Sequence, residues 1–259
     1  MPRAYHIRLD KKTLRGAAIA LLPGDPARSA LIAGFISRRY STPFKMLASN
    51  REFTTHLACI NGAFIAVTST GIGGPSATIA VEELASSGIR TFIRVGTSGS
   101  IQDRVKPGDC VITTGSVRLD GSSTHYAPVE YPAISDFSVV HALVEGAKKA
   151  NIRYHLGITA SSATFYPGEE RRDSFRKYSI RSIRNGRLEW RKLNVLNYEM
   201  ESASILVAAG SMGLRAGCVT GVVNAAGDIT ENALKKGETN AVKTAVFAAE
   251  EVIRRGLYE

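Results

Sequence analysis

Three segments of the chain combine glycine with arginine or a helical pattern in ways that suit an anion. The segment PGDPAR holds Gly24, where the backbone can approach a ligand closely, and Arg28, whose guanidinium can pair with an oxyanion. In RVGTSG, Arg94 ends an apolar run and is soon followed by Thr97. A charge at that point is costly unless it is paired, which favours a phosphate partner. The glycine-rich segment 69–76 is too common a pattern to decide anything alone.

Two further segments carry groups that could bind an organic ligand. TFYPGEER, residues 164–171, supplies an aromatic ring for stacking and polar groups for the edge of a base. A Pro-Gly turn with surface charges is an equal alternative. NYEMES, residues 197–202, is expected to open a helix that carries Glu199 and Glu201. Residues two apart do not share a helix face, so at most one carboxylate should point into a cleft while the other caps the helix or faces water.

Cysteine and histidine spacing argues against a bound metal or a disulfide framework. Cys59, Cys110 and Cys218 lie far apart and form no CxxC pair. None of the five histidines forms an HxxxH or HExxH pattern. We therefore expect neither a catalytic metal nor a disulfide framework.

Strand and helix patterns alternate along the chain and must position these segments. Apolar, β-branched runs that predict strands cover residues 16–22, 63–70, 90–95, 109–117, 154–161 and 216–223. Helical patterns cover residues 76–87, 137–150, 198–212 and 239–255. We predict an α/β fold, a single domain over residues 1–259 with a mixed central β-sheet flanked by helices. The sheet is mixed because Asn61-Gly62, typical of a type I′ turn, joins two strands as a hairpin.

Composition narrows the class of protein. A formal charge of +10 permits nucleic-acid binding but also suits a small anionic substrate, and the basic residues are spread along the chain. We expect no nucleic-acid partner. No apolar run approaches the roughly 18 residues that span a bilayer, and residues 1–16 lack the apolar core of a signal peptide. We therefore expect a cytoplasmic protein without a membrane partner.

Taken in order, several segments resemble the bacterial, hexameric nucleoside phosphorylase family. They are PGDPAR, REFTTH, STGIGGPSATIAVEELASSGIRTFIRVGTSGSI, GSVRLDGSSTHYAP, TASSATFYPGEER and NYEMESA, and they cover nearly the whole chain. A single glycine motif would mean little, but this ordered set is highly specific. The resemblance implies the nucleoside phosphorylase fold and a pentosyltransferase that splits a nucleoside with inorganic phosphate as co-substrate, with no metal or organic cofactor required. Uridine is the nucleoside expected, with uracil and ribose 1-phosphate as products.

The resemblance also implies roles for individual residues. The phosphate site would comprise Gly24, Arg28, Arg94 and Thr97, with Arg51 from a neighbouring subunit. The ribose would be held by Met200, Glu201 and His6, the last reaching across a dimer. The base would lie against Phe165, Glu169 and Arg171. Arg94 and Glu201 would be catalytic. Some relatives bind a potassium ion between subunits at the positions of Glu52, Ile72 and Ser76. A dimer-based homohexamer with shared active sites is therefore expected.

Two departures from the family pattern lie at the base. In the uridine-specific members we expect glutamine where this chain has Glu169. An amide offers one donor and one acceptor to uracil, whereas a carboxylate only accepts. Glu169 could be protonated in a dry pocket, could swing away to pair with Arg171, or could read a base with two adjacent donors such as guanine. The segment 221–228 has small residues where relatives carry a longer apolar stretch and an arginine, so the pocket could be roomier.

Other functions remain as alternatives. A purine nucleoside phosphorylase acting on guanosine or inosine would use the same scaffold. A nucleosidase that uses water would leave Arg28, Arg51 and Arg94 without an anionic partner. A nucleoside- or RNA-binding module without catalysis would not need to retain the phosphate set together with Glu201.

Overall fold

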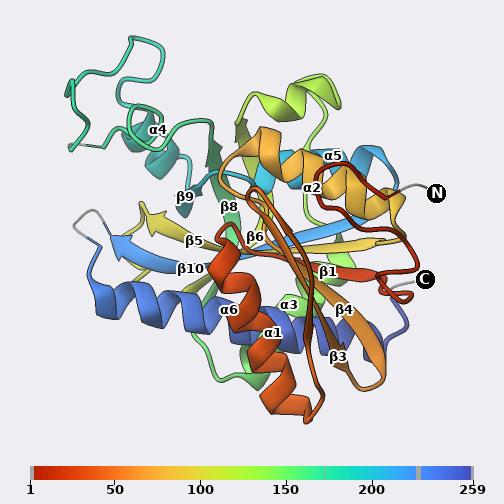
Figure 1. Ribbon diagram of the computed structural model, residues 1–259. Helices are drawn as coiled ribbons and strands as arrows, with labels where there is room; N and C mark the ends of the chain where they lie inside the picture. Colours follow the sequence, from red (N-terminus) through yellow and green to blue (C-terminus); the bar gives the residue numbers. More distant parts are fainter. Residues whose placement is uncertain (1–2, 172, 226–228, 258–259) are drawn as a thin grey trace.

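A computed structural model describes residues 3–171, 173–225 and 229–257. Its strands are β1 (Ile19–Leu22), β2 (Lys45–Asn50), β3 (Phe53–Ile60), β4 (Ala63–Thr68), β5 (Thr91–Ser100), β6 (Cys110–Leu119), β7 (Ala133–Ile134), β8 (Tyr154–Ser162), β9 (Asn197–Glu199) and β10 (Arg215–Ala225). Its α-helices are α1 (Pro26–Tyr40), α2 (Gly74–Ser86), α3 (Phe137–Lys149), α4 (Gly186–Lys192), α5 (Ser202–Ser211) and α6 (Glu231–Arg254), with a short 3-10 helix at Ser122–His125. Figure 1 shows their arrangement.

All the strands belong to one mixed sheet, in the order β10-β6-β8-β9-β5-β1-β4-β3-β2, with β7 paired to β6. A further pairing joins β10 to β5, so β5, β10, β6, β8 and β9 form a closed ring. The parallel pairs include β1 with β4 and β5, and β10 with β5. Their carboxyl ends therefore meet at one edge of the sheet, which is where ligands bind in α/β folds.

The predicted hairpin is confirmed. β3 and β4 pair antiparallel, and the turn residues Asn61 and Gly62 both have positive φ, 49° and 87°. That combination gives the type I′ turn, whose twist matches the twist of the two strands. The α/β class and the mixed sheet flanked by helices are confirmed with it.

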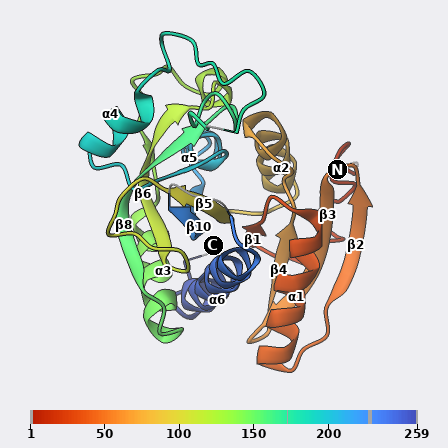
Figure 2. The same ribbon diagram turned by 90° about the vertical axis from the view of Figure 1, so that its left-hand side faces the viewer.

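Helices cover both faces of the sheet (Figure 2). On one face, α1, α3 and α6 bury residues such as Ile32, Leu143 and Val246 in a shared apolar core. On the other face, α2 and α5 bury Val81 and Leu206 in a second core. Successive residues of β1 alternate between the two cores, as the pleat of a strand requires. Both cores hold the carboxyl ends of the central strands in fixed positions.

Two of the four predicted helices match to within a few residues, and a third, α6, begins eight residues earlier than expected, at Glu231. The fourth, predicted over residues 198–212, was wrong at its start. Residues 197–199 form strand β9 instead, and α5 begins at Ser202. Pairing of β9 with β5 on one side and β8 on the other overrides the helical pattern there.

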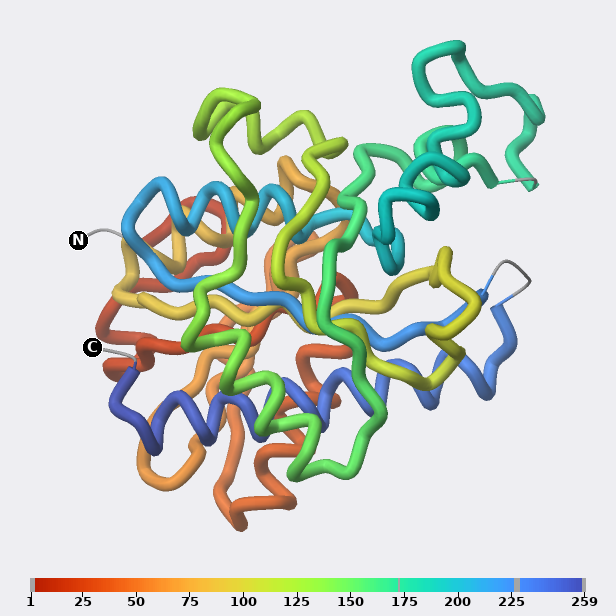
Figure 3. Tube along the Cα trace, turned by 180° about the vertical axis from the view of Figure 1, so that it is seen from behind, coloured from red at the N-terminus to blue at the C-terminus, as the bar shows by residue number. Residues whose placement is uncertain are grey.

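The segment between β8 and β9 leaves the body of the molecule, as Figure 3 shows in teal. The sequence predicts an irregular excursion over residues 171–191, and most of it lacks regular structure, but it also contains α4. Helix α4 returns the chain toward the sheet edge. Among the helices of the described residues, each is too short or too polar to cross a membrane.

Candidate active site

A cavity of about 570 Å³ lies at the carboxyl ends of the central strands. Its walls come from the β1–α1 and β4–α2 loops, the end of β5, the loop after β8, the β9–α5 junction and the end of β10. The residues that sequence analysis predicted as ligands and that line it are Gly24, Arg28, Arg94, Thr97, Phe165, Glu169, Arg171, Met200 and Glu201. The fold thus gathers residues from distant segments around one space large enough for a small molecule.

Arg94 lies deep in this cavity, with 5% of its surface exposed. Its Nη2 forms an ion pair and hydrogen bond with Glu201 Oε2. The other oxygen of Glu201 accepts a hydrogen bond of 2.6 Å from the backbone N–H of Gly73. Burial alone would lower the pKa of Arg94, but the carboxylates of Glu201 and Glu199 outweigh it and raise the pKa. Arg94 therefore keeps its charge in a dry environment.

Glu199 also lines the cavity, contrary to the expectation that only one of the two acids would do so. Glu199 and Glu201 are 3% and 2% exposed. Glu199 caps α5 by accepting from the backbone N–H groups of Glu201 at 2.9 Å and Ser202 at 2.8 Å. Its Oε2 lies 3.7 Å from Arg94 Nε, within ion-pair distance. The predicted helix cap is therefore confirmed, but Glu199 also reaches the cavity because it ends a strand, where helix periodicity does not apply.

Two glycines leave room for the Arg94 guanidinium. A Cβ atom on Gly96 would lie 3.0 Å from Arg94 Nη2, and one on Gly24 would lie 3.4 Å from Nη1. Arg94 Nε is buried and has no hydrogen-bond partner among the described residues. A buried donor without an acceptor is costly, which favours an anionic ligand in this place.

Arg28 comes from the first turn of α1, which Asp25 caps by accepting from Ala27 N at 2.8 Å. The Arg28 guanidinium is paired with Glu238 of α6. Nothing in the sequence pointed to Glu238, because the two residues are brought together only by the packing of α1 near α6.

The far end of the cavity is built from the loop after β8. The Arg171 guanidinium lies 4.3 Å from the centre of the Phe165 ring. It also donates two hydrogen bonds to Asp173, of 2.9 Å and 2.8 Å. Sequence analysis considered an ion pair between Arg171 and Glu169 as one of three arrangements. Among the described residues that pair is absent, and Arg171 binds Asp173 instead.

Glu169 is 8% exposed, and its carboxyl has no hydrogen-bond or ion-pair partner within the described part of the chain. Burial raises its pKa to about 8. The charges of Arg171 and Arg187 oppose that rise, and those of Glu199 and Glu201 add to it. The carboxyl is therefore largely neutral at pH 7, which agrees with the dry-pocket hypothesis.

A chain of buried hydrogen bonds runs through the closed ring to the cavity wall. It joins Thr113, Thr159, Asn197, Thr220 and Ser98 through contacts of 2.8 to 2.9 Å. Ser98 lines the cavity beside Thr97. Sequence analysis did not identify this series of hydrogen bonds, because polar residues on a strand are expected to face solvent. Here the closed ring of strands buries them.

His6 and Arg51 do not line the cavity of their own chain. His6 Nδ1 lies 2.8 Å from Glu83 Oε1 of α2, and its carbonyl accepts a hydrogen bond of 2.7 Å from the Asn50 amide. Arg51 follows Asn50 directly, is exposed and has a positive φ of 53°. The two residues predicted to serve a neighbouring subunit thus lie close together.

Glu52 and Ser76 also lie together, since Ser76 Oγ donates to Glu52 Oε1 at 3.1 Å. Ile72, the third residue predicted for a potassium site, is 76% exposed. Among the described residues there is no group of three or more His, Cys, Asp or Glu side chains that could hold a metal. A site here would depend on backbone and hydroxyl oxygens as well as Glu52.

In the segment 221–228, Val223 and Asn224 line the cavity. Ala226, Gly227 and Asp228 lie outside the described residues.

A match to a family model agrees with the assignment made from the sequence motifs and with the geometry of the cavity. Residues 18–255 match the model of the phosphorylase superfamily. The chain belongs to that superfamily. A relative from Escherichia coli named uridine phosphorylase is 50% identical over 252 residues, which are 96% of this chain and 98% of that protein. Another relative of that name, from Haemophilus influenzae, is 45% identical over 256 residues, 98% of this chain and all of that protein.

A more distant phosphorylase carries a different name. The relative from Halorubrum lacusprofundi is named guanosine phosphorylase and is 37% identical over 202 residues, 78% of this chain and 76% of that protein. The superfamily membership and the resemblance inferred from the sequence motifs thus agree, and both names describe the phosphorolysis of a nucleoside.

Proposed function

We propose that this member of the phosphorylase superfamily catalyses the reaction of uridine with phosphate to give uracil and ribose 1-phosphate. The relatives named uridine phosphorylase align over almost the whole chain, which supports the reaction. The observation that carries the proposal is the buried Arg94 between two carboxylates, with an Nε donor that lies 3.7 Å from Glu199 Oε2 and has no hydrogen-bond partner among the described residues. Such a group suits an anionic co-substrate beside a polar sugar.

Phosphate would bind between Arg28, Arg94, Thr97 and Gly24, with Arg51 supplied by a neighbouring subunit. Because Arg28 is paired with Glu238, phosphate would take over that guanidinium as it enters. Arg94 has a fixed position, set by Glu201 and by the glycines around it. Its charge would orient the phosphate oxygen that attacks C1′ of the ribose.

Glu201 would accept hydrogen bonds from the 2′ and 3′ hydroxyls of the ribose, and Met200 would pack against the sugar. His6 of a partner chain would reach the 5′ hydroxyl. As the bond between C1′ and the base breaks, the sugar gains positive charge, which the bound phosphate stabilises. The base leaves with the bonding electrons, and a donor such as Arg171 near its carbonyl oxygen would stabilise the anion.

Glu169 would read the edge of uracil as a neutral carboxylic acid. A protonated carboxyl has one O–H donor and one C=O acceptor, the same pair that a glutamine amide offers. The raised pKa of Glu169 supports that form at neutral pH. The exchange of glutamine for glutamate at this position is then compatible with uridine, and Phe165 would stack on the base.

Guanosine is the second candidate substrate. Guanine presents two adjacent donors at N1 and N2, which an ionised carboxylate accepts. A relative named guanosine phosphorylase is consistent with this use of the scaffold. Above a pH of about 8, where Glu169 ionises, guanosine would therefore gain relative to uridine.

The assembly we propose is a dimer-based hexamer, because His6 and Arg51 lie outside their own cavity and next to each other. Glu52, Ser76 and the backbone at Ile72 would hold a potassium ion between subunits, since carboxylate, hydroxyl and carbonyl oxygens are the ligands that hard cations prefer. We propose further that residues 1–259 form one domain and that the protein acts in the cytoplasm.

One assay tests the reaction. The purified protein is incubated with uridine, thymidine, inosine or guanosine, each with and without phosphate, and released base is measured over a pH series. We expect release from uridine only with phosphate, with a decline above a pH of about 8 as Glu169 ionises. Release that does not need phosphate would mean a nucleosidase and would overturn the proposal.

A further inference from the structure

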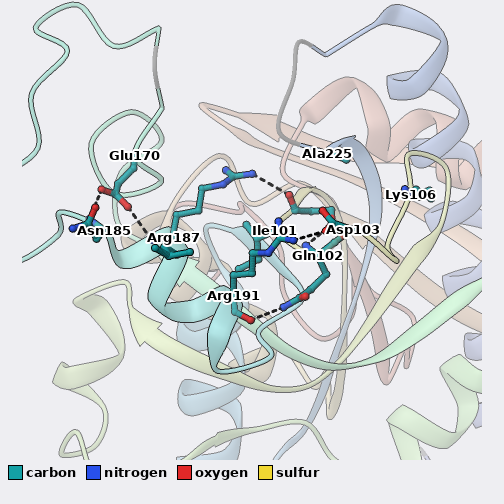
Figure 4. A pocket seen from close by; sticks show the side chains of 11 residues that line it. Ile101, Gln102, Asp103, Lys106, Glu170, Asn185, Arg187, Arg191 and Ala225 are labelled. Atoms are coloured by element: carbon teal, nitrogen blue, oxygen red, sulfur yellow. Dashed lines mark hydrogen bonds and ion pairs between the residues drawn. The ribbon is translucent and has the colours of Figure 1, made fainter.

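A second cavity, of about 580 Å³, lies beside the first (Figure 4). Ser100, Glu170 and Ala225 line it, and each is the direct sequence neighbour of a residue that lines the first cavity, namely Gly99, Glu169 and Asn224. The two cavities therefore share a wall made by the end of β5, the loop after β8 and the end of β10.

Arg187 of α4 extends along this wall. Its Nη2 donates a hydrogen bond of 3.1 Å to the carbonyl of Ser100, and its backbone N–H donates one of 2.8 Å to Glu170 Oε2. Figure 4 shows both contacts as dashed lines. Within the described part of the chain, no carboxylate lies at ion-pair distance from its guanidinium. One turn along the helix, Arg191 differs because it pairs with Asp103.

The charge of Arg187 therefore acts on groups at longer range. Burial lowers the pKa of Arg187, and the neighbours that oppose this are Tyr198, Glu169 and Glu170. Two of these, Tyr198 and Glu169, line the first cavity. A half-buried cation near a buried carboxyl that lacks a partner among the described residues favours the ionised form of that carboxyl.

The charged groups that face Glu169 come from four parts of the fold. Arg171 lies on the same loop, Arg187 on α4, Glu199 on β9 and Glu201 at the start of α5. Arg171 is already engaged by Asp173, and each of the two acids is close to Arg94. Arg187 is thus the cation in this set without an acidic ion-pair partner among the described residues.

We propose that Arg187, on the wall that the two cavities share, is a positioning residue for base recognition, which acts by its charge on the buried Glu169 and so affects whether that carboxyl donates to the base or accepts from it. The proposal rests on the proposed function, because it concerns how the same site chooses its base. With Arg187 present, Glu169 is still neutral at neutral pH, which favours uridine, and it ionises just above neutral pH, which favours guanosine. Without Arg187, Glu169 would stay neutral to a higher pH.

The test is Arg187→Met, which removes the charge and keeps an apolar stem of similar length. kcat/KM for uridine and for guanosine is measured from about pH 6 to about pH 10, a range that spans the ionisation of a carboxyl with a raised pKa. We expect the alkaline decline with uridine to move up by about one pH unit. At alkaline pH the variant should therefore retain a larger fraction of its neutral-pH kcat/KM for uridine than the wild type retains.

Three matched variants make the result specific. Arg187→Lys keeps the charge and should keep the wild-type profile. Arg191→Met removes a cation that lies on the same helix, lines the same cavity and is paired with Asp103. Arg184→Met removes an exposed cation. Both should leave the midpoint of the uridine decline unchanged. If Arg187→Met does not fold, Arg187→Gln serves in its place, and folding is checked by thermal denaturation.

An unchanged midpoint in Arg187→Met, or an equal change in Arg191→Met, would overturn the proposal. A lower kcat/KM with the wild-type pH profile would mean a structural role only and would also overturn it. Failure of the proposed function gives a different result, because the wild type would then release no uracil in the presence of phosphate.

Discussion

The two ends of the cavity are built in different ways. At the phosphate end, Arg94 lies on a central strand, is nearly fully buried and is held by Glu201 and flanked by Glu199. At the base end, Phe165, Glu169 and Arg171 lie on a loop that leaves the body of the molecule, and Glu169 has no partner among the described residues. The comparison teaches that packed strands fix the residues proposed to bind phosphate, while the residues proposed to read the base lie on a loop with few contacts.

The largest expected effect is at the phosphate end. Arg94→Met should lower kcat/KM for every nucleoside by about a thousandfold, since it removes a preorganised cation at the attacking oxygen. It also leaves Glu199 and Glu201 buried beside each other without their cation, so the melting temperature should fall. Steady-state kinetics with uridine and guanosine measure the first effect, and thermal denaturation the second.

Arg90→Met is the control for this experiment, because Arg90 directly precedes the same strand and its guanidinium donates to the backbone carbonyls of Ala85 and Ile89. It should leave kcat/KM close to the wild-type value. Substantial turnover in Arg94→Met, within about tenfold of the wild type, would contradict the role of Arg94 and the contrast between the two ends.

The second prediction concerns the base end, where an effect should depend on the base and on pH. Glu169→Gln keeps one donor and one acceptor at every pH. The part of the alkaline decline with uridine that is due to Glu169 should disappear. At alkaline pH the ratio of kcat/KM for uridine to that for guanosine should rise about tenfold, the worth of one or two hydrogen bonds.

In Glu169→Gln any alkaline decline that remains is due to the ionisation of uridine itself. The difference between this variant and the wild type therefore gives the contribution of Glu169. Glu189→Gln, an exposed carboxylate on α4, is the matched control and should behave as the wild type. If the ratio of the two substrates is the same in Glu169→Gln and the wild type at all pH values, Glu169 does not read the base.

The contrast between the ends also explains how much could be predicted from the sequence. Local patterns gave the central strands, most helices, the hairpin at Asn61-Gly62 and the segments that meet at the cavity. Loops after parallel strands must converge at one sheet edge, so glycine and arginine in those loops were sufficient to locate the cavity.

What the sequence did not reveal depends on long-range packing. The closed ring needs the pairing of β10 with β5, and only this ring buries Thr159 and Asn197 as a hydrogen-bonded chain. The start of α5 was misjudged because β9 pairs with β5 and β8, and sequence periodicity does not report such long-range pairing. Glu238 and Arg187 come close to the first cavity only because α6 and α4 pack near it, and no sequence motif marks either residue.

The smallest expected effect tests the base end from the opposite direction. In Asp173→Asn the Arg171 guanidinium loses its carboxylate partner, so more of its charge acts on Glu169 and lowers the pKa of that carboxyl. The alkaline decline with uridine should move to lower pH, opposite to the change in Arg187→Met. Asp173 is largely exposed, so solvent screening limits the effect to about two- to threefold in kcat/KM near the midpoint. A shift toward higher pH, measured in the same pH series, would show that Arg171 does not act on Glu169 by its charge. Opposite shifts in the two variants would establish that the cations on the loop and on α4 together set the ionisation of one carboxyl, and through it the choice of base.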